Sequence, residues 1–199
     1  MTDFTAEIKG RTLEYIDDDH VYLVDGVQVP SITQILNSRY GHKYDFVNKE
    51  VLRKAAEAGT AVHDAIEMYC RDGTESDLPE VEGFKTLLRQ YGFLVIENEV
   101  PVILFDGDEP IAAGRVDMVL KMDGQIGGAD IKRTSSLDKE YLTYQLNLYR
   151  VAYYQSYGIE WEFLRGIHLR NEVRQFVQIP INDELPWESV NQYIFGGQK

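Results

Sequence analysis

The stretch GRVDMVLKMDGQIGGADIKR, residues 114–133, decides the fold of this chain. Two apolar runs flank the pair Asp123-Gly124, and an Asp-Gly pair in that setting is the strongest short-range signal for a β-hairpin with a two-residue turn. If the residues on either side of the turn pair with each other, Asp117 faces Asp130 across the hairpin. Directly paired residues have Cβ atoms about 4.5–5.5 Å apart. The sequence therefore predicts two neighbouring carboxylates at the open end of one hairpin.

Two carboxylates this close need a compensating charge. Unit charges ~4 Å apart repel by about 4 kcal/mol at an effective dielectric of ~20, and a cation between Asp117 and Asp130 would remove that cost. Strand side chains alternate with period two, so Lys132 shares the face of Asp130. The opposite face is apolar, at Val116, Met118 and Leu120. We interpret the pattern as a divalent-metal site.

Two alternatives apply to this hairpin. Its acids could be solvated charges on the open face of an antiparallel sheet, which is a common arrangement. Gly127-Gly128 could also host a β-bulge, which would shift the register by one residue and separate the two carboxylates.

The composition indicates a globular protein. At 199 residues, 44% hydrophobic and 27% charged, the chain is expected to form a single domain, residues 1–199, with a sizeable core. Its one cysteine, Cys70, excludes an intrachain disulfide and a four-cysteine metal or iron–sulfur site. The first residues lack the basic and apolar regions of a signal peptide, and no apolar run approaches the length of a membrane span. We expect a cytoplasmic protein.

The charge balance limits how the protein could hold nucleic acid. Acidic residues outnumber Lys and Arg by 33 to 20, for a net charge of −13. Bulk neutralisation of phosphates by basic side chains, which supplies most non-specific affinity, is therefore disfavoured. Basic and aromatic residues do alternate at residues 39–44 and around Arg165, His168, Arg170 and Arg174. A local basic track beside an acidic metal site remains open.

Hydrophobic periodicity and turn signals predict a mixed α/β (α+β) fold, a central mixed β-sheet flanked by helices. The N-terminal strands, within residues 11–30 and turning at Asp25-Gly26, form a β-hairpin extension of that core. Helices are expected at residues 31–38, 49–70, 80–91 and 138–157, with a short one after 186. Further strands are expected at residues 93–105, 161–170 and 172–179, besides the 111–133 hairpin.

Three further positions are candidates for the site. His63 lies on the helix over residues 49–70, with Glu67 one turn later on the same face, and neutral imidazole is a common metal ligand. An isolated histidine on a helix surface is the alternative. Gln145 and Tyr149 are one turn apart on the helix after Lys132, where a polar edge and an aromatic core would produce the same pattern. Glu99, before Pro101, is either an outer acid of the metal site or a solvated strand residue.

Read in order, these residues resemble the PD-(D/E)XK nucleases, in particular their RecB-like exonuclease branch. The upstream HVYLVDGVQVPSIT, residues 20–33, is similar to phage-type members, and the resemblance covers roughly residues 20–155. The matching elements are His63-Asp64-Ala65-Ile66-Glu67, Gly114-Arg115-Val116-Asp117, Asp130-Ile131-Lys132 and Gln145-Leu146-Asn147-Leu148-Tyr149.

The resemblance implies a restriction-endonuclease-like core and a role for each matching residue. Asp117, Asp130 and the Ile131 carbonyl would bind Mg²⁺ or Mn²⁺, with His63 as an extra ligand. Lys132 would orient or deprotonate the attacking water and hold the scissile phosphate. The last motif, Gln145 and Tyr149, would support the lysine and the phosphate backbone. Asp130 stands where Glu is more frequent, and the cysteines of iron–sulfur relatives are missing, so no cluster is expected.

The resemblance also implies a function. We expect a metal-dependent deoxyribonuclease, an exonuclease encoded by a phage or prophage and acting in recombination or DNA processing inside a bacterial cell. Its partners would be DNA and, as in some relatives, further copies of the chain or a protein of a recombination complex. A structure- or sequence-specific endonuclease is one alternative, and a non-catalytic binding module on a nuclease fold is another. The complete set Asp117, Asp130 and Lys132 disfavours the binding module, because an inactive protein has no need to keep it.

Overall fold

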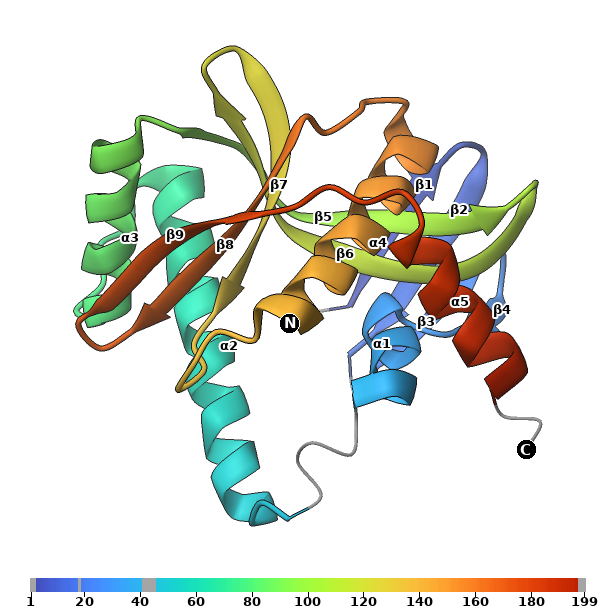
Figure 1. Ribbon diagram of the computed structural model, residues 1–199, viewed down its shortest axis with the longest axis horizontal. Helices are drawn as coiled ribbons and strands as arrows, with labels where there is room; N and C mark the ends of the chain where they lie inside the picture. The colour runs from blue at the N-terminus through green and yellow to red at the C-terminus, as the bar shows by residue number, and fades with distance from the viewer. Residues whose placement is uncertain (1–2, 18, 41–45, 197–199) are drawn as a thin grey trace.

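The computed structural model describes residues 3–17, 19–40 and 46–196, and these form two β-sheets with helices packed against them (Figure 1). The first sheet is antiparallel and contains β1 (Phe4–Ile8), β2 (Arg11–Ile16), β3 (Val21–Val24) and β4 (Val27–Val29). The second has the order β5-β6-β7-β8-β9, with bounds Leu94–Asp106, Glu109–Met122, Gln125–Lys132, Phe163–Arg170 and Val173–Ile179. The helices are α1 (Ile32–Tyr40), α2 (Lys49–Asp72), α3 (Pro79–Tyr91), α4 (Lys139–Tyr157) and α5 (Leu185–Gly196). The predicted mixed α/β class is confirmed.

The central sheet is mixed because one of its connections is a helix. Strands β5, β6 and β7 are joined by tight turns and pair antiparallel, as do β8 and β9. Strand β7 continues through α4 to β8, and these two strands pair in parallel, as a helical crossover allows. The ends of α4 match the sequence signals, because the Asp138 side chain accepts from Tyr141 N–H and Gly158 ends the helix in the left-handed region.

The β6–β7 hairpin has the predicted register. Its pairs run without a shift from Met122 opposite Gln125 to Met118 opposite Ala129. The turn residue before Gly124 is Asp123, and both have positive φ, 52° and 85°, as a type I′ turn requires. The next positions in this register are Asp117 and Asp130, so the alternative of a bulge within the β6–β7 ladder is excluded.

The two glycines of β7 permit close packing. A Cβ built on Gly128 would lie 2.0 Å from the ring of Trp161, and one on Gly127 would lie 2.3 Å from the Phe163 carbonyl oxygen. Trp161 is among the largest fully buried side chains of the described residues. Glycine at these positions lets β7 seat against the Trp161–Phe163 segment.

Helices cover both faces of the central sheet (Figure 1). One buried cluster joins α2 and α3 to the sheet, and the other joins α1, α4 and α5 to it. The three apolar residues expected on one face of β6 are all buried, but they divide between these clusters. Met118 and Leu120 pack with α2 and α3, whereas Val116 packs with α1 and α4.

The N-terminal part differs from the expected hairpin extension over residues 11–30. It is a four-stranded sheet, because β1 pairs with β2 along its whole length. The five residues of β1 alternate between less and more exposed positions, a period-two pattern that is readable in the sequence. This sheet packs on the β5–β6 hairpin through a shared core with Ile103, Phe105 and Ala113, and Ala113 N–H donates to the Pro30 carbonyl at 3.0 Å.

Among the helices in the described ranges, none is both long and apolar enough to cross a lipid bilayer.

The packing at Gly128 generates a paired prediction. Gly128→Ala forces a methyl group into the Trp161 ring, and overpacking of this kind costs about 1–3 kcal/mol of unfolding free energy. Gly59→Ala in α2 meets nothing within 4 Å and should stabilise the protein by about 1 kcal/mol, because glycine is a poor helix former. Urea unfolding of both variants measures the difference. A Gly128→Ala protein as stable as the wild type would contradict the packing described above.

Candidate metal centre

Three elements bring possible metal ligands to one point. His63 comes from α2, Glu99 from β5 and Asp117 from β6. The Nδ1 atom of His63 lies 3.8 Å from Glu99 Oε1 and 3.7 Å from Asp117 Oδ2, and one ligand atom of each residue lies within 4.8 Å of the others. All three side chains are partly buried. This is a geometry that one metal ion could bridge.

The second predicted acid lies beside this group and contacts the predicted lysine. Lys132 Nζ is 2.6 Å from Asp130 Oδ2, so the two side chains form a largely buried ion pair. The Ile131 backbone links the two groups: its N–H donates to Asp117 Oδ2 at 2.8 Å, and its carbonyl lies 3.1 Å from His63 Nε2. Asp130, at 3% side-chain exposure, is the most buried acid of the site.

Glu99 is the residue whose role the sequence left open. Its φ is +52° within a β-strand, a conformation that non-glycine residues adopt at a cost and that clusters at functional sites. Its Oε1 lies 3.8 Å from His63 Nδ1, and Arg115 Nε lies 2.6 Å from Glu99 Oε2. Glu99 therefore belongs to the site and is not a solvated strand residue.

In the metal-free site, the acids and His63 shift one another's pKa values. Burial alone would lower the pKa of His63, but the carboxylates of Asp117, Glu99 and Asp130 outweigh it and raise that pKa to about 9. Burial raises the pKa of Asp117. Burial also raises the pKa of Asp130 to about 6, with a further contribution from Asp117 and an opposing one from Lys132. In the metal-free site, burial thus disfavours the ionised form of both aspartates, and His63 stays protonated at neutral pH.

The pKa of Lys132 moves in the direction opposite to that expected of a general base. Burial favours the neutral amine, but Asp130 and Asp117 outweigh it and raise the pKa above the ordinary lysine value. In the metal-free protein Lys132 is therefore a stable ammonium. Its ion pair with Asp130 occupies an oxygen that a metal would also use.

The two residues of the last motif are buried on α4. The Tyr149 ring packs on Gly114, where an added Cβ would lie 2.9 Å from its Cε1 atom. Burial raises the Tyr149 pKa well above its usual value, and Asp117 and Asp130 add to the shift, so this hydroxyl stays protonated near the two acids. Gln145 is 6% exposed, and its Oε1 has no hydrogen-bond partner within the described ranges. Its role toward Lys132 stays a prediction.

Other expectations around the site come out differently. Glu67 is half-buried but is not one of the three grouped ligands. The small residues Gly59 and Ala61 do not bring α2 close to the sheet, because a Cβ on Gly59 would meet nothing within 4 Å and Ala61 is exposed.

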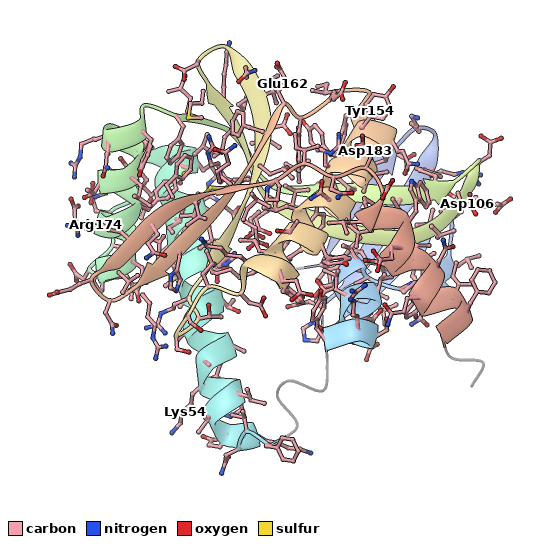
Figure 2. All side chains as sticks on the ribbon, in the orientation of Figure 1. Lys54, Asp106, Tyr154, Glu162, Arg174 and Asp183 are labelled. Atoms are coloured by element: carbon pink, nitrogen blue, oxygen red, sulfur yellow. The ribbon has the colours of Figure 1, made fainter. Side chains whose placement is uncertain are left out.

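The basic track expected around residues 165–174 is not a continuous surface. His168 is buried, and its Nε2 lies 2.8 Å from the Thr134 carbonyl oxygen. The Arg165 guanidinium lies 5.4 Å from the ring centres of Phe163 and Phe176. Figure 2 shows Arg174 at the far end of the β8–β9 hairpin, beside α3. Residues 41–44 of the other basic stretch lie outside the described residues.

The donor set fits a hard or borderline divalent cation. Carboxylates, a backbone carbonyl and water are the ligands of Mg²⁺ and Mn²⁺, and imidazole is a further ligand for several divalent metals. The raised pKa of both buried aspartates is the feature that a bound cation would relieve. Binding would release the His63 proton, because only the neutral imidazole can be a ligand.

Comparison with known proteins assigns no family to this chain. No family model matches the chain, and no curated protein matches its sequence. Seventeen chains of solved structures are similar to it in fold. One is the crystal structure of SSO0001, with a TM-score of 0.48 and 15% sequence identity over 83% of this chain and 75% of that one. Function must therefore be inferred from the side chains of the site.

Replacing one acid of the centre gives the second prediction. Asp117→Asn keeps an oxygen that can accept the Ile131 N–H bond but removes a charge that the metal needs. Metal affinity should fall by at least the roughly 10- to 100-fold that loss of an outer-shell partner costs. Because the folded-state pKa of Asp117 is raised, its carboxylate lowers stability at pH values above its unfolded pKa. The metal-free melting temperature at pH 7 should therefore hold or rise.

Calorimetric titration with Mn²⁺ and thermal melts in EDTA measure the two effects. Asp123→Asn, in the exposed turn of the same hairpin, is the matched control and should change neither. A clear fall in the metal-free melting temperature of Asp117→Asn would indicate a structural role for Asp117.

Proposed function

We propose that this chain is a Mg²⁺- or Mn²⁺-dependent nuclease that hydrolyses DNA phosphodiester bonds, acting as an exonuclease in recombination or DNA processing. One observation carries the proposal. Asp117, Asp130 and Glu99 converge with His63 and Lys132 in a partly buried site where burial raises the pKa of both aspartates. A protein that only needed stability would gain by replacing such a cluster with apolar residues.

The residues divide into those that would hold a metal and one that would act on the phosphate. Asp117, Asp130, Glu99 and the Ile131 carbonyl offer oxygen ligands, and His63 offers nitrogen. When bound, the metal would acidify a water and neutralise charge on the phosphate oxygens. Lys132 lies at the edge of this group with its ammonium on Asp130, where it can hold a non-bridging phosphate oxygen and orient the attacking water.

The protonation state of Lys132 favours a role as a charged donor to phosphate over a role as general base. Its raised pKa supports a charged donor that binds phosphate, whereas a general base would have to lose that proton first. Once a cation shares Asp130, the ammonium is free to turn from the carboxylate to the substrate. Lys132 is thus proposed as a phosphate-holding and water-orienting group.

The net negative charge is compatible with DNA as substrate if the protein contacts only the few phosphates at the reaction centre. Contacts to a few phosphates at the reaction centre do not require a basic protein, and bound cations offset part of the −13 net charge. Repulsion elsewhere keeps non-specific binding weak. We expect modest affinity for DNA with a strong dependence on divalent metal.

Metal dependence is the third prediction. Linear DNA should be degraded with Mg²⁺ or Mn²⁺ and left intact with excess EDTA. Ca²⁺ should support cleavage poorly, because it accepts looser geometry and more ligands and so binds without aligning the reaction. An electrophoretic time course with each metal measures this, and full cleavage in EDTA would rule out a metal-dependent reaction.

Covalently closed circular DNA is the parallel substrate in the same assay. An exonuclease needs an end, so the circle should survive while the linear form of the same plasmid disappears. Rapid cutting of the circle would instead favour the endonuclease alternative on the same metal chemistry.

The role of Lys132 is the fourth prediction. Lys132→Ala should lose about 10²–10³-fold in single-turnover rate, the usual effect of removing one charge-stabilising donor. Binding of metal and DNA should change little, because the interaction is made mainly in the transition state, and loss of one phosphate contact lowers the salt slope by only about one unit.

Cleavage in Mg²⁺ and DNA binding in Ca²⁺ are measured on the same preparations. Lys121→Ala, an exposed lysine on β6, is the matched control and should keep the wild-type rate. A rate and an affinity that fall by the same factor would make Lys132 a simple phosphate anchor.

A further inference from the structure

A cavity adjoins the candidate metal centre at Lys132. It has a volume of about 200 Å³ and lies between α1, the segment that follows β7 and the first turn of α4. Lys132 lines it and also contacts Asp130, so one side chain separates this space from the metal ligands. Other lining residues are Asn37, Tyr40, Thr134, Ser136 and Tyr141.

The wall of the cavity is aromatic on two sides. Tyr40 and Tyr141 meet edge to face, with ring centres 5.5 Å apart, and Tyr40 packs in the same way on Tyr144 at 5.9 Å. The Lys132 ammonium lies 6.0 Å from the centre of the Tyr141 ring. The Tyr141 ring is partly buried and is the aromatic side chain of this lining that lies beside Lys132.

Polar side chains and two charged ones, Lys132 and Asp138, complete the lining. Asn37 offers an amide that both donates and accepts, and Thr134 and Ser136 also line the cavity. The Thr134 hydroxyl donates to the Ser136 carbonyl at 2.8 Å. The carboxylate at the rim, Asp138, caps α4 by accepting from the Tyr141 N–H at 3.0 Å. The Tyr40 hydroxyl donates to Glu140 at 2.9 Å. Mixed aromatic and hydrogen-bonding walls suit a planar heterocycle.

The volume of the cavity limits the size of the ligand it can hold. The cavity is smaller than the ~300–1,000 Å³ of sites for drug-sized molecules, so it has room for one small ring system and not for a whole nucleotide. The remaining atoms of a nucleotide would stay outside, with a phosphate toward Lys132. The geometry points to a nucleobase pocket: we propose that the base next to the scissile phosphate leaves the DNA stack and rests on Tyr141.

This inference rests on the proposed nuclease function and extends it to the form of the substrate. A base within a duplex is stacked on both faces and paired along its edge, so it must be extruded before it can enter such a pocket. Single strands and frayed ends present bases that are already unpaired. The chain should therefore prefer single-stranded or frayed DNA over the interior of a duplex, and it should do so with little sequence selectivity, because every base has a face that stacks on an aromatic ring.

A scan with abasic nucleotides tests the pocket. Single-stranded oligonucleotides, each with one abasic residue at a different distance from the cleavage site, are cleaved under single-turnover conditions with Mg²⁺ or Mn²⁺. In the wild type, one position beside the scissile phosphate should slow cleavage by roughly 5- to 150-fold, the effect of losing one base–aromatic stack. Equal rates at all positions, with cleavage intact, would overturn the pocket. The abasic scan uses the wild-type protein alone.

Variants identify Tyr141 as the stacking residue. Tyr141→Ala should lose the same factor on intact DNA and become insensitive to the abasic residue, whereas Tyr141→Phe should behave as the wild type. Tyr154→Ala is the matched control, since Tyr154 is an exposed tyrosine on the same helix (Figure 2). A Tyr141→Ala protein that slows equally on intact and abasic DNA would overturn stacking in favour of an effect on Lys132.

The outcome also separates the two proposals. Wild-type protein that cleaves no DNA with any divalent metal would overturn the nuclease function and the pocket with it. Wild-type protein that cleaves but ignores abasic residues would keep the nuclease and overturn only the pocket.

Discussion

Buried negative charge is the constraint on which this structure depends. Asp117, Asp130 and Glu99 meet in a space with little access to water, and in the metal-free protein three cations hold them. Protonated His63 lies between two of the acids, Lys132 contacts the third, and Arg115 pairs with Glu99. Each contact replaces part of the lost hydration. If a divalent metal binds, we expect two of these cations to leave the acids. His63 would lose its proton, and Lys132 would turn from Asp130 to the substrate.

The scaffold around the acids explains why they cannot relax apart. Asp117 and Asp130 stand at the end of a hairpin whose pairing is fixed from its turn, and Ile131 ties them through its N–H to Asp117 and its carbonyl to His63. Strand β7 pairs with β8, and glycine at position 128 leaves room for Trp161, which precedes β8. Packing beside the site therefore maintains its geometry, since a well-packed interior does not deform continuously.

The parts of this arrangement that the sequence predicted are those governed by local rules. The Asp123-Gly124 turn sets its own register, so the positions of Asp117 and Asp130 follow from a few residues. Glu99 is different. The β5–β6 turn pairs Asp106 with Glu109, but a shift between Leu104 and Phe105 moves the register by one before Glu99 is reached. That bulge and the positive φ of Glu99 arise from tertiary packing, and no short-range pattern encodes them. The additional strand β1, by contrast, had a readable alternation.

The N-terminal sheet contacts the candidate metal centre through Arg115, the partner of Glu99. The Arg115 guanidinium that pairs with Glu99 lies 5.6 Å from the centre of the Phe4 ring, and Phe4 stacks on Tyr15 at 5.6 Å. An arginine held between an aromatic face and a carboxylate loses little further freedom when it pairs, so it fixes Glu99 more firmly than a solvated lysine would. The ion pair with Arg115 and the contact with His63 therefore offset the strain in the Glu99 backbone. Without them, a strand residue would not keep this positive φ. The first sheet is thus part of the support of the site and not a decoration of the core.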